Sequence, residues 1–338
     1  MKKYKICKIL LVILAIFLCV AFYELLGICV AYKKQPEVSN TTKKETKNGS
    51  WNECSENTER AVIIEKNPEA LLQRVRLIKN AKKEIILSTF AFQSDESGKL
   101  ILGALHDAAD RGVHIRLLVD GMESWIDMEG NPYFYGLSSH ENVEIKLYNK
   151  ANPLKPWKMM GRMHDKYLIA DGKRYILGGR NTYNYFLGDF PGHKNYDRDV
   201  LVVCDEPEKE NSVNQLLEYF ETIWEQEDSG YFHDNKKLAN RKSVKNAVLE
   251  LQNGYQKYFE ENKERICDTD YTDETFETEK IALVSNPIHT GPKEPVVWYQ
   301  LGELMKNAKE RVKIHTPYII CNDMMYNTWK EIAERVPD

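Results

Sequence analysis

Short apolar runs alternate with amphipathic stretches from residue 61 onward, and this alternation limits the chain to few folds. Residues 61–64, 84–92 and 113–119 are rich in branched or aromatic side chains, which is typical of strands. Between them, residues 67–81 and 99–111 repeat apolar side chains at helical spacing. Strands separated by helices predict an α/β domain whose sheet is mostly parallel and covered by helices.

The first 32 residues predict a membrane anchor. An uncharged apolar run covers residues 9–23, and it resumes after Glu24 over residues 25–32. At about 1.5 Å per residue, about 24 residues span about 36 Å, more than a hydrocarbon core of about 30 Å. No small-residue cleavage site follows the run, so an uncleaved single-pass anchor is favoured over a cleaved signal peptide. The lysines before the run favour a cytoplasmic amino end, and therefore a cell-membrane protein with an extracytoplasmic body.

The remaining chain divides into four regions by composition. Residues 33–60 read as a polar linker, and residues 61–205 as a first α/β domain. Residues 206–279 read as a polar helical connector, and residues 280–338 as the start of a second α/β domain. Three apolar side chains of the connector recur at helical spacing and are expected in the core rather than at a cofactor: Leu216, Phe220 and Trp224.

Composition excludes some classes of site. The 47 basic and 51 acidic residues give a formal charge of −4, so no general positive field favours nucleic acid as a partner. There is no CxxC and no paired Cys/His spacing of the zinc type, so we expect no structural metal site. No cofactor is predicted either. Four of the seven cysteines lie outside the apolar run, and their spacing leaves open whether any two form a disulfide: Cys54, Cys204, Cys267 and Cys321.

An internal repeat underlies the division into two α/β domains. Residues 77–89 align without a gap with residues 304–316, and six positions are identical. A chance similarity between two helix-to-strand units is the alternative. The favoured interpretation is that a second copy begins near Lys280, and that the chain stops soon after the first strand and the following helix of that copy.

The residue types best suited to chemistry lie between residues 163 and 186. His164, Lys166 and Asp171 form the pattern H-x-K-x4-D. Residues 166–170 are predicted to alternate as a strand, which places the side chains of His164 and Lys166 on one face. An imidazole beside an ammonium suits a phosphate group, because lysine holds it as a point charge while histidine attacks phosphorus or moves a proton.

A second cluster follows the Asp171-Gly172 turn. Residues 174–177 are predicted to return as a neighbouring strand that ends in Gly178-Gly179, and Asn181 comes two residues later. Two small residues allow the backbone to approach a ligand closely, and the amide of Asn181 is able to donate to a phosphate oxygen. Each feature alone is ordinary in proteins, but their joint spacing indicates a phosphoryl site.

The stretches HDKYLIAD (residues 164–171) and GGRN (residues 178–181) resemble the phospholipase D superfamily, and more closely its cardiolipin synthase-like bacterial branch. Residues 108–121 and 196–203 support the resemblance. It implies an α/β fold with a mixed sheet flanked by helices, in which two H-x-K-x4-D motifs meet at one active site. It also implies that one histidine forms a covalent phosphohistidine, that the other protonates the leaving alcohol, and that no metal is required.

The resemblance also implies roles for individual residues. His164 would be the nucleophile or its acid/base partner, with Lys166 and Asn181 as phosphate ligands beside Gly179. Asp171 belongs to the catalytic motif and is expected to stabilise it rather than to contact substrate. An acid would orient the His164 ring, and the choice between Asp197 and Asp199 stays open.

The 338 residues contain no second H-x-K-x4-D motif. Three explanations compete. The favoured one is a chain that stops before its second motif in cis, so that the first half is complete and the second only begun. Alternatively, homodimerisation supplies the second motif in trans, or the protein is a non-catalytic half-site. The first two leave this chain alone a poor enzyme, because general acid–base catalysis contributes about 10² to 10⁴-fold.

The anchor favours an anionic phospholipid in the membrane as the partner, and phosphatidyl transfer as the function. Two phosphatidylglycerols would be joined into cardiolipin with release of glycerol. The segment before the motif supports this, because its apolar and cationic side chains are suited to an anionic lipid interface, although an ordinary buried loop is the alternative: Lys155, Trp157, Lys158, Met159, Met160 and Arg162. Competing hypotheses are hydrolysis of a lipid or nucleic-acid phosphodiester, with nucleic acid disfavoured, and a scaffold role without catalysis.

Overall fold

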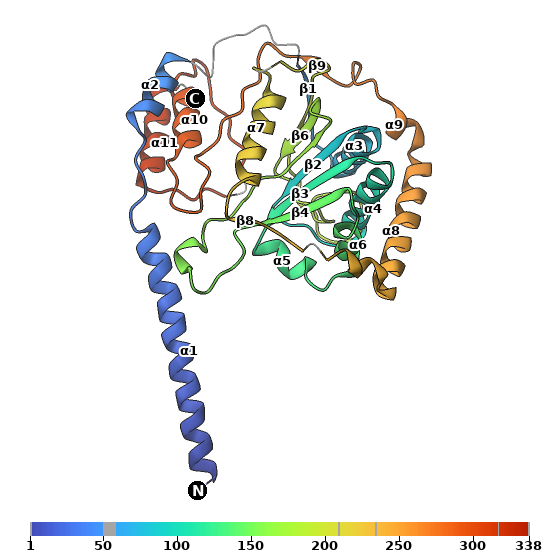
Figure 1. The fold of residues 1–338 in the computed structure, drawn as a ribbon. Helices are drawn as coiled ribbons and strands as arrows, with labels where there is room; N and C mark the ends of the chain where they lie inside the picture. Colours follow the sequence, from blue (N-terminus) through green and yellow to red (C-terminus); the bar gives the residue numbers. More distant parts are fainter. Residues whose placement is uncertain (1, 50–58, 209, 234, 317, 337–338) are drawn as a thin grey trace.

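A computed structural model of the chain describes residues 2–49, 59–208, 210–233, 235–316 and 318–336. The described part contains a nine-stranded sheet in the order β8-β4-β3-β2-β5-β6-β7-β1-β9, with helices on both faces (Figure 1). The strands are β1 (Arg60–Ile64), β2 (Glu84–Thr89), β3 (His114–Asp120), β4 (Val143–Tyr148), β5 (Tyr167–Ala170), β6 (Arg174–Gly178), β7 (Asp199–Val203), β8 (Ser229–Tyr231) and β9 (Phe276–Glu277).

The sheet is mixed, as the family resemblance implies. The prediction of a mostly parallel sheet is wrong, since only the β2–β3 and β3–β4 pairs of the described sheet are parallel. Helical crossovers join β2, β3 and β4, whereas the three residues 171–173 connect β5 to β6 and require an antiparallel pair. In that turn, Asp171 and Gly172 adopt positive φ angles of 55° and 63°.

Two hydrophobic clusters hold helices on the two faces of the sheet. The larger cluster lies under α3 (Asn67–Asn80), α4 (Glu96–Asp110), α6 (Pro132–Ser138) and α8 (Lys242–Glu261). The smaller cluster lies under α7 (Ser212–Trp224). It includes Leu216, Phe220 and Trp224, which are at most 4% exposed, so their predicted core role is confirmed. Two shorter α-helices and two 3-10 turns also belong to this part of the fold: α5 (Glu123–Met128), α9 (Lys263–Cys267), η1 (Pro156–Lys158) and η2 (Lys236–Asn240).

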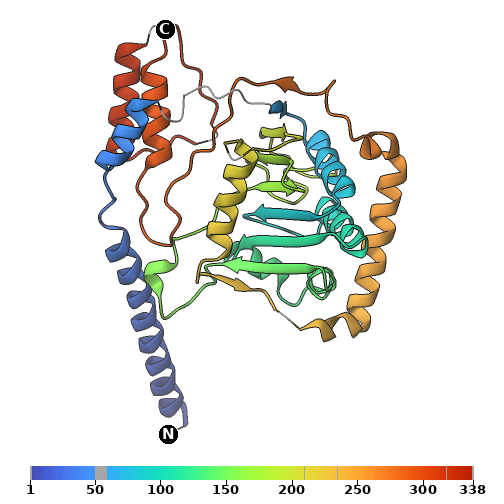
Figure 2. The ribbon, with the colours of Figure 1, turned by 45° about the horizontal axis from the view of Figure 1, so that its top comes forward.

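The C-terminal residues form a separate helical layer (Figures 1 and 2). α10 (Val296–Lys306) packs against α11 (Asp323–Arg335), and α2 (Asn40–Asn48), which lies inside the predicted linker, contacts α10. The repeat predicts a helix followed by a strand, but residues 311–316 form no strand. A strand needs a hydrogen-bonding neighbour, and no described strand lies beside this stretch, where Ile314 is half exposed.

The amino-terminal helix α1 (Lys2–Tyr32) projects from the body (Figure 1). Among the described residues it is the one helix long and apolar enough to cross a membrane, with a mean hydropathy of 2.9 and no part of that stretch buried. Its C-terminal end is held by the body, since the Tyr23 hydroxyl donates to the carbonyl of Leu154 at 3.1 Å. The Tyr32 hydroxyl likewise donates to the carbonyl of Thr290 at 2.8 Å.

The structure describes three of the four cysteines whose pairing the sequence leaves open. Cys267 and Cys321 are exposed free thiols, and Cys204 is buried at the end of β7. Cys54 lies outside the described residues.

Candidate active site

His164 and Lys166 lie just before β5 and meet on the ring of Phe90, the residue that follows β2. The His164 ring centroid is 4.6 Å from that of Phe90, and the Lys166 Nζ atom lies 5.1 Å from the Phe90 ring centroid. The Lys166 ammonium also donates to the backbone carbonyl of His164 at 2.7 Å. The imidazole and the ammonium therefore share one small area of surface.

Both side chains line a cavity of about 390 Å³. Tyr219 of α7 forms part of its wall, and the Tyr219 hydroxyl donates to the Asp165 carboxylate at 2.7 Å. The segment of residues 283–297 closes another side and contributes Lys293. A phosphate group fits a space of this size, and three cationic residues line it, because Arg162 joins Lys166 and Lys293 in the lining.

Burial changes the protonation of both motif side chains. Lys166 is 5% exposed, and desolvation lowers its pKa to about 8, opposed by the charges of Asp165, Asp197 and Asp120. Desolvation and the nearby Lys166 ammonium lower the pKa of His164 below its usual 6.5. Near pH 7 the site therefore combines a neutral imidazole, whose lone pair is available, with a cationic amine.

Asp120, at the end of β3, holds the residues just before His164. Its fully buried carboxylate accepts from the Met163 backbone N–H at 3.0 Å and pairs with the Arg162 guanidinium at 3.1 Å. Sequence reasoning missed this residue. Its position in the sequence could have indicated a role, because Asp120 is an acid at the carboxyl end of a buried strand that belongs to a parallel pair. Ligand sites of parallel sheets lie at the carboxyl ends of the strands.

The glycine pair leaves room for two carboxylates, and Gly178 also lines the His164 cavity. A Cβ atom on Gly178 would lie 2.0 Å from an Asp199 carboxylate oxygen, and one on Gly179 would lie 2.0 Å from an Asp197 oxygen. Asn181 is 8% exposed, and its Oδ1 accepts from the Ala91 backbone N–H at 3.1 Å, next to Phe90. The Nδ2 group of Asn181 is therefore the part of the side chain that is left as a hydrogen-bond donor.

Asp197 and Asp199, the two candidates for orienting the His164 ring, differ in burial and in their partners. Asp199 is 1% exposed and pairs with the guanidinium groups of Arg74 at 3.0 Å and Arg180 at 3.2 Å. Asp197 is half-buried and raises the pKa of Lys166 electrostatically. Within the described residues neither carboxylate is hydrogen-bonded to the His164 ring.

Asp171 lies at the far end of β5 from His164. Its carboxylate accepts from three successive backbone N–H groups at 2.7 to 3.1 Å, which belong to Lys82, Lys83 and Glu84 at the start of β2. The structure therefore does not bring Asp171 to the cavity. Its contacts tie the β5–β6 turn to the neighbouring strand.

Comparison with known proteins identifies the family of the central part of the chain. A family model described as cardiolipin synthase, PLD-like domain, matches residues 74–224. An uncharacterized protein from Helicobacter pylori (strain ATCC 700392 / 26695) is 28% identical over 298 residues, which cover 80% of this chain and 56% of that protein. Cardiolipin synthase C of Escherichia coli (strain K12) is 29% identical over 171 residues, which cover 46% of this chain and 34% of that protein.

The chain spans about half the length of the Helicobacter pylori relative. Among solved structures, NucT from Helicobacter pylori matches with a TM-score of 0.40 and 16% identity over 52% of this chain and 99% of that one. The family match includes β2 to β7 and α7, and hence Phe90, His164, Lys166 and Asn181. Residues 74–224 are therefore a phospholipase D-like domain of the cardiolipin synthase type.

Proposed function

We propose that the protein is a membrane-anchored phosphatidyltransferase that joins two phosphatidylglycerols into cardiolipin and releases glycerol. The observation that carries this proposal is the pairing of the His164 imidazole and the Lys166 ammonium on Phe90, at the wall of one cavity. A neutral imidazole is able to attack phosphorus, and a buried ammonium binds a phosphate oxygen strongly because little water competes.

In the first step, a nitrogen of His164 attacks the phosphorus of one phosphatidylglycerol. A P–N bond forms while the P–O bond to glycerol breaks, and the glycerol oxygen takes a proton from a second histidine. In the second step, the free hydroxyl of another phosphatidylglycerol attacks the same phosphorus and returns a proton to the second histidine. The P–N bond breaks, cardiolipin leaves, and both histidines regain their first state.

The remaining motif residues have supporting roles in this proposal. Lys166 and the Nδ2 amide of Asn181 hold non-bridging phosphate oxygens, beside the backbone at Gly179. Asp171 keeps β5 in register with β2 through its backbone contacts. Of the two acids, Asp197 is the better placed to act on the motif, because Asp199 is occupied by two buried arginines.

The second histidine comes, in this proposal, from a second phospholipase D-like half in the same polypeptide or from a second copy of the chain. The helix α1 anchors the protein, with the amino end in the cytoplasm and the body outside. Sedimentation of the full-length protein in detergent separates the two sources, because a homodimer is required only for the second.

The reaction is tested with full-length protein in vesicles that contain phosphatidylglycerol labelled in its glycerol headgroup. We expect free glycerol and cardiolipin in equal amounts, and at least about a 10³-fold loss in His164→Ala. His315→Ala removes an exposed histidine outside the cavity and serves as the matched control. Glycerol with phosphatidic acid would indicate a phosphodiesterase instead, and neither product, or full activity in His164→Ala, would contradict a catalytic role.

A further inference from the structure

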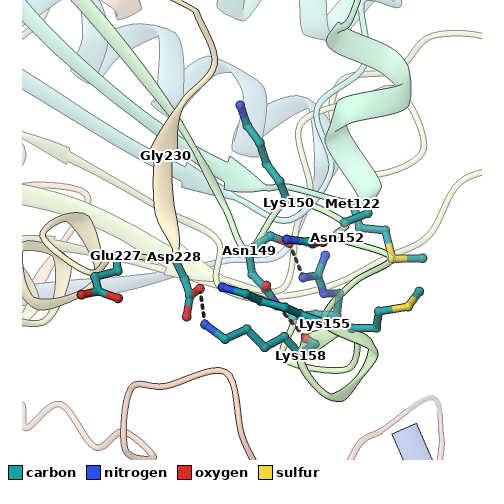
Figure 3. Close-up of a pocket in the computed structure, with 12 residues that line it drawn as sticks. Met122, Asn149, Lys150, Asn152, Lys155, Lys158, Glu227, Asp228 and Gly230 are labelled. Carbon is teal, nitrogen blue, oxygen red and sulfur yellow. Dashed lines mark hydrogen bonds and ion pairs between the residues drawn. The ribbon is translucent and has the colours of Figure 1, made fainter. Parts of the chain in front are cut away.

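A second cavity, lined by four cationic side chains and two carboxylates, shares Arg162 with the His164 cavity. It has a volume of about 200 Å³ and lies between residues 149–162 and the start of β8 (Figure 3). Lys150, Lys155 and Lys158 line it, and Arg162 lines both this cavity and the one that contains His164. The two spaces therefore meet at a residue only two positions before the motif histidine.

The positive charge of this second cavity is only partly neutralised. Lys158 forms an ion pair with Asp228 at 2.6 Å, drawn as a dashed line in Figure 3. Lys150 donates to the neutral carbonyl of Tyr231 at 2.8 Å, and desolvation lowers its pKa. Lys155 forms no ion pair with any described residue, and its side chain is exposed. The four cations outnumber the carboxylates of Glu227 and Asp228 in the lining, so the cavity keeps a net positive charge for an anion.

The same loop lies at the end of the predicted membrane span. A hydrocarbon core of about 30 Å takes about 20 residues, so a span that begins at Ile9, where the uncharged run begins, ends near residue 28, just after Tyr23 and Gly27. Tyr23 contacts Leu154, and Gly27 packs so closely on Pro156 that a Cβ atom would lie 2.4 Å from its ring. The loop is thereby held at the level of the lipid headgroups.

Apolar side chains surround the cavity on this side. Leu154, Trp157 and Met160 are 77%, 45% and 58% exposed, and they flank the lysines along the loop. On α5, which begins beside the cavity lining residue Met122, Ile126 is 76% exposed. Exposed aromatic and aliphatic side chains next to lysines are typical of a surface that enters an anionic lipid interface. Arg162 was also expected to face the lipid interface, but it pairs with buried Asp120 instead.

We propose that this cavity binds the headgroup phosphate of a second anionic phospholipid. This lipid belongs to the outer leaflet, where the C-terminal end of α1 leaves the membrane. Lys155 and Lys158 take the phosphate, and Trp157 lies among the adjoining lipid chains. This inference rests on the proposed function and adds a place for the acceptor, whose free hydroxyl would approach the phosphorus past Arg162.

The test uses full-length protein in phosphatidylcholine vesicles that contain an equal small fraction of brominated phosphatidylglycerol or brominated phosphatidylcholine. Bromine on the lipid chains quenches a nearby tryptophan, and the contribution of Trp157 is the difference between the wild type and Trp157→Phe. We expect brominated phosphatidylglycerol to quench Trp157 at least about twofold more than brominated phosphatidylcholine, because two lysines attract the anionic headgroup.

Lys155→Gln/Lys158→Gln should bring that quenching ratio to about one, and Lys155→Gln alone, which breaks no ion pair, should lower it partly. The matched control is Lys82→Gln/Lys83→Gln, an exposed lysine pair at the opposite end of β5, which should keep the wild-type ratio. Equal quenching by the two lipids in the wild type, or a ratio unchanged in the double variant, overturns the inference. Quenching needs no turnover, so His164→Ala should keep the ratio even though it removes the proposed reaction.

Discussion

The affinity of the His164 cavity for an anion should fall steeply above pH 8, because the cation that holds the anion is buried. Lys166 is 5% exposed and has its pKa lowered to about 8, so its charge is present below that pH and lost above it. About half of the molecules carry the ammonium at pH 8, and about a tenth at pH 9. Sulfate keeps its charge over this range, so its apparent affinity should fall about tenfold between pH 7 and pH 9.

Two variants separate Lys166 from other causes of such a fall. Lys166→Arg retains a positive charge at every pH in the range, so its sulfate affinity should change less than about twofold. Lys173→Arg replaces an exposed lysine at the β5–β6 turn and should keep the steep wild-type dependence. The pKa of His164 is already lowered, so its ring is neutral above pH 7 and adds no slope.

Calorimetric titration of sulfate into the full chain in detergent measures this effect. The titration is made on the Lys155→Gln background, so that the second cavity contributes less binding. An affinity that stays flat from pH 7 to pH 9 would refute the assignment of Lys166 as the anion ligand. So would an equally steep fall in Lys166→Arg.

Three stability predictions follow from the contacts around the motif, all measured by urea unfolding of the full chain in detergent. Gly178→Ala should lower the free energy of unfolding by about 2 kcal/mol, and Gly179→Ala by less, because Asp199 is fixed by two arginines whereas Asp197 is half-buried. Asp199→Asn should cost about 3 kcal/mol and Asp197→Asn less than about 0.5 kcal/mol, since only the first breaks buried ion pairs. Asp171→Ala should cost about 2 kcal/mol and Asp171→Asn about 1 kcal/mol, because asparagine tolerates the left-handed backbone and keeps an acceptor oxygen. Equal losses within any of these pairs would contradict the contact that distinguishes its two members.

The parts of the site that depend on neighbours along the chain were predictable. The short spacing of His164 and Lys166 indicates one surface, and apolar periodicity locates the helices and most of the strands that frame it. Phe90 and Asp120 were not predictable in the same way. They reach the motif across the sheet from strands 40 to 80 residues earlier, and no local spacing records that contact.

The errors have the same physical origin. Strand direction depends on how distant segments pair, so a helix–strand alternation in residues 61–121 did not reveal that β5 to β7 add antiparallel neighbours. The helix of the second repeat forms as α10, because its hydrogen bonds are internal. The strand predicted at residues 311–316 does not form, because its hydrogen bonds require a partner strand. The contact of the glycine pair with two carboxylates was likewise not predictable, because Asp197 and Asp199 lie about twenty residues later in the chain.

The most direct test of the account is a crystal structure of the protein with tungstate, a phosphate-like anion whose position is unmistakable in diffraction. The account predicts one tungstate in the His164 cavity, with its oxygens within hydrogen-bonding distance of both the His164 ring and the Lys166 Nζ atom. A cavity without tungstate at saturating concentration, or an imidazole and an ammonium that face different spaces, would contradict the shared phosphoryl pocket on which the proposed reaction depends.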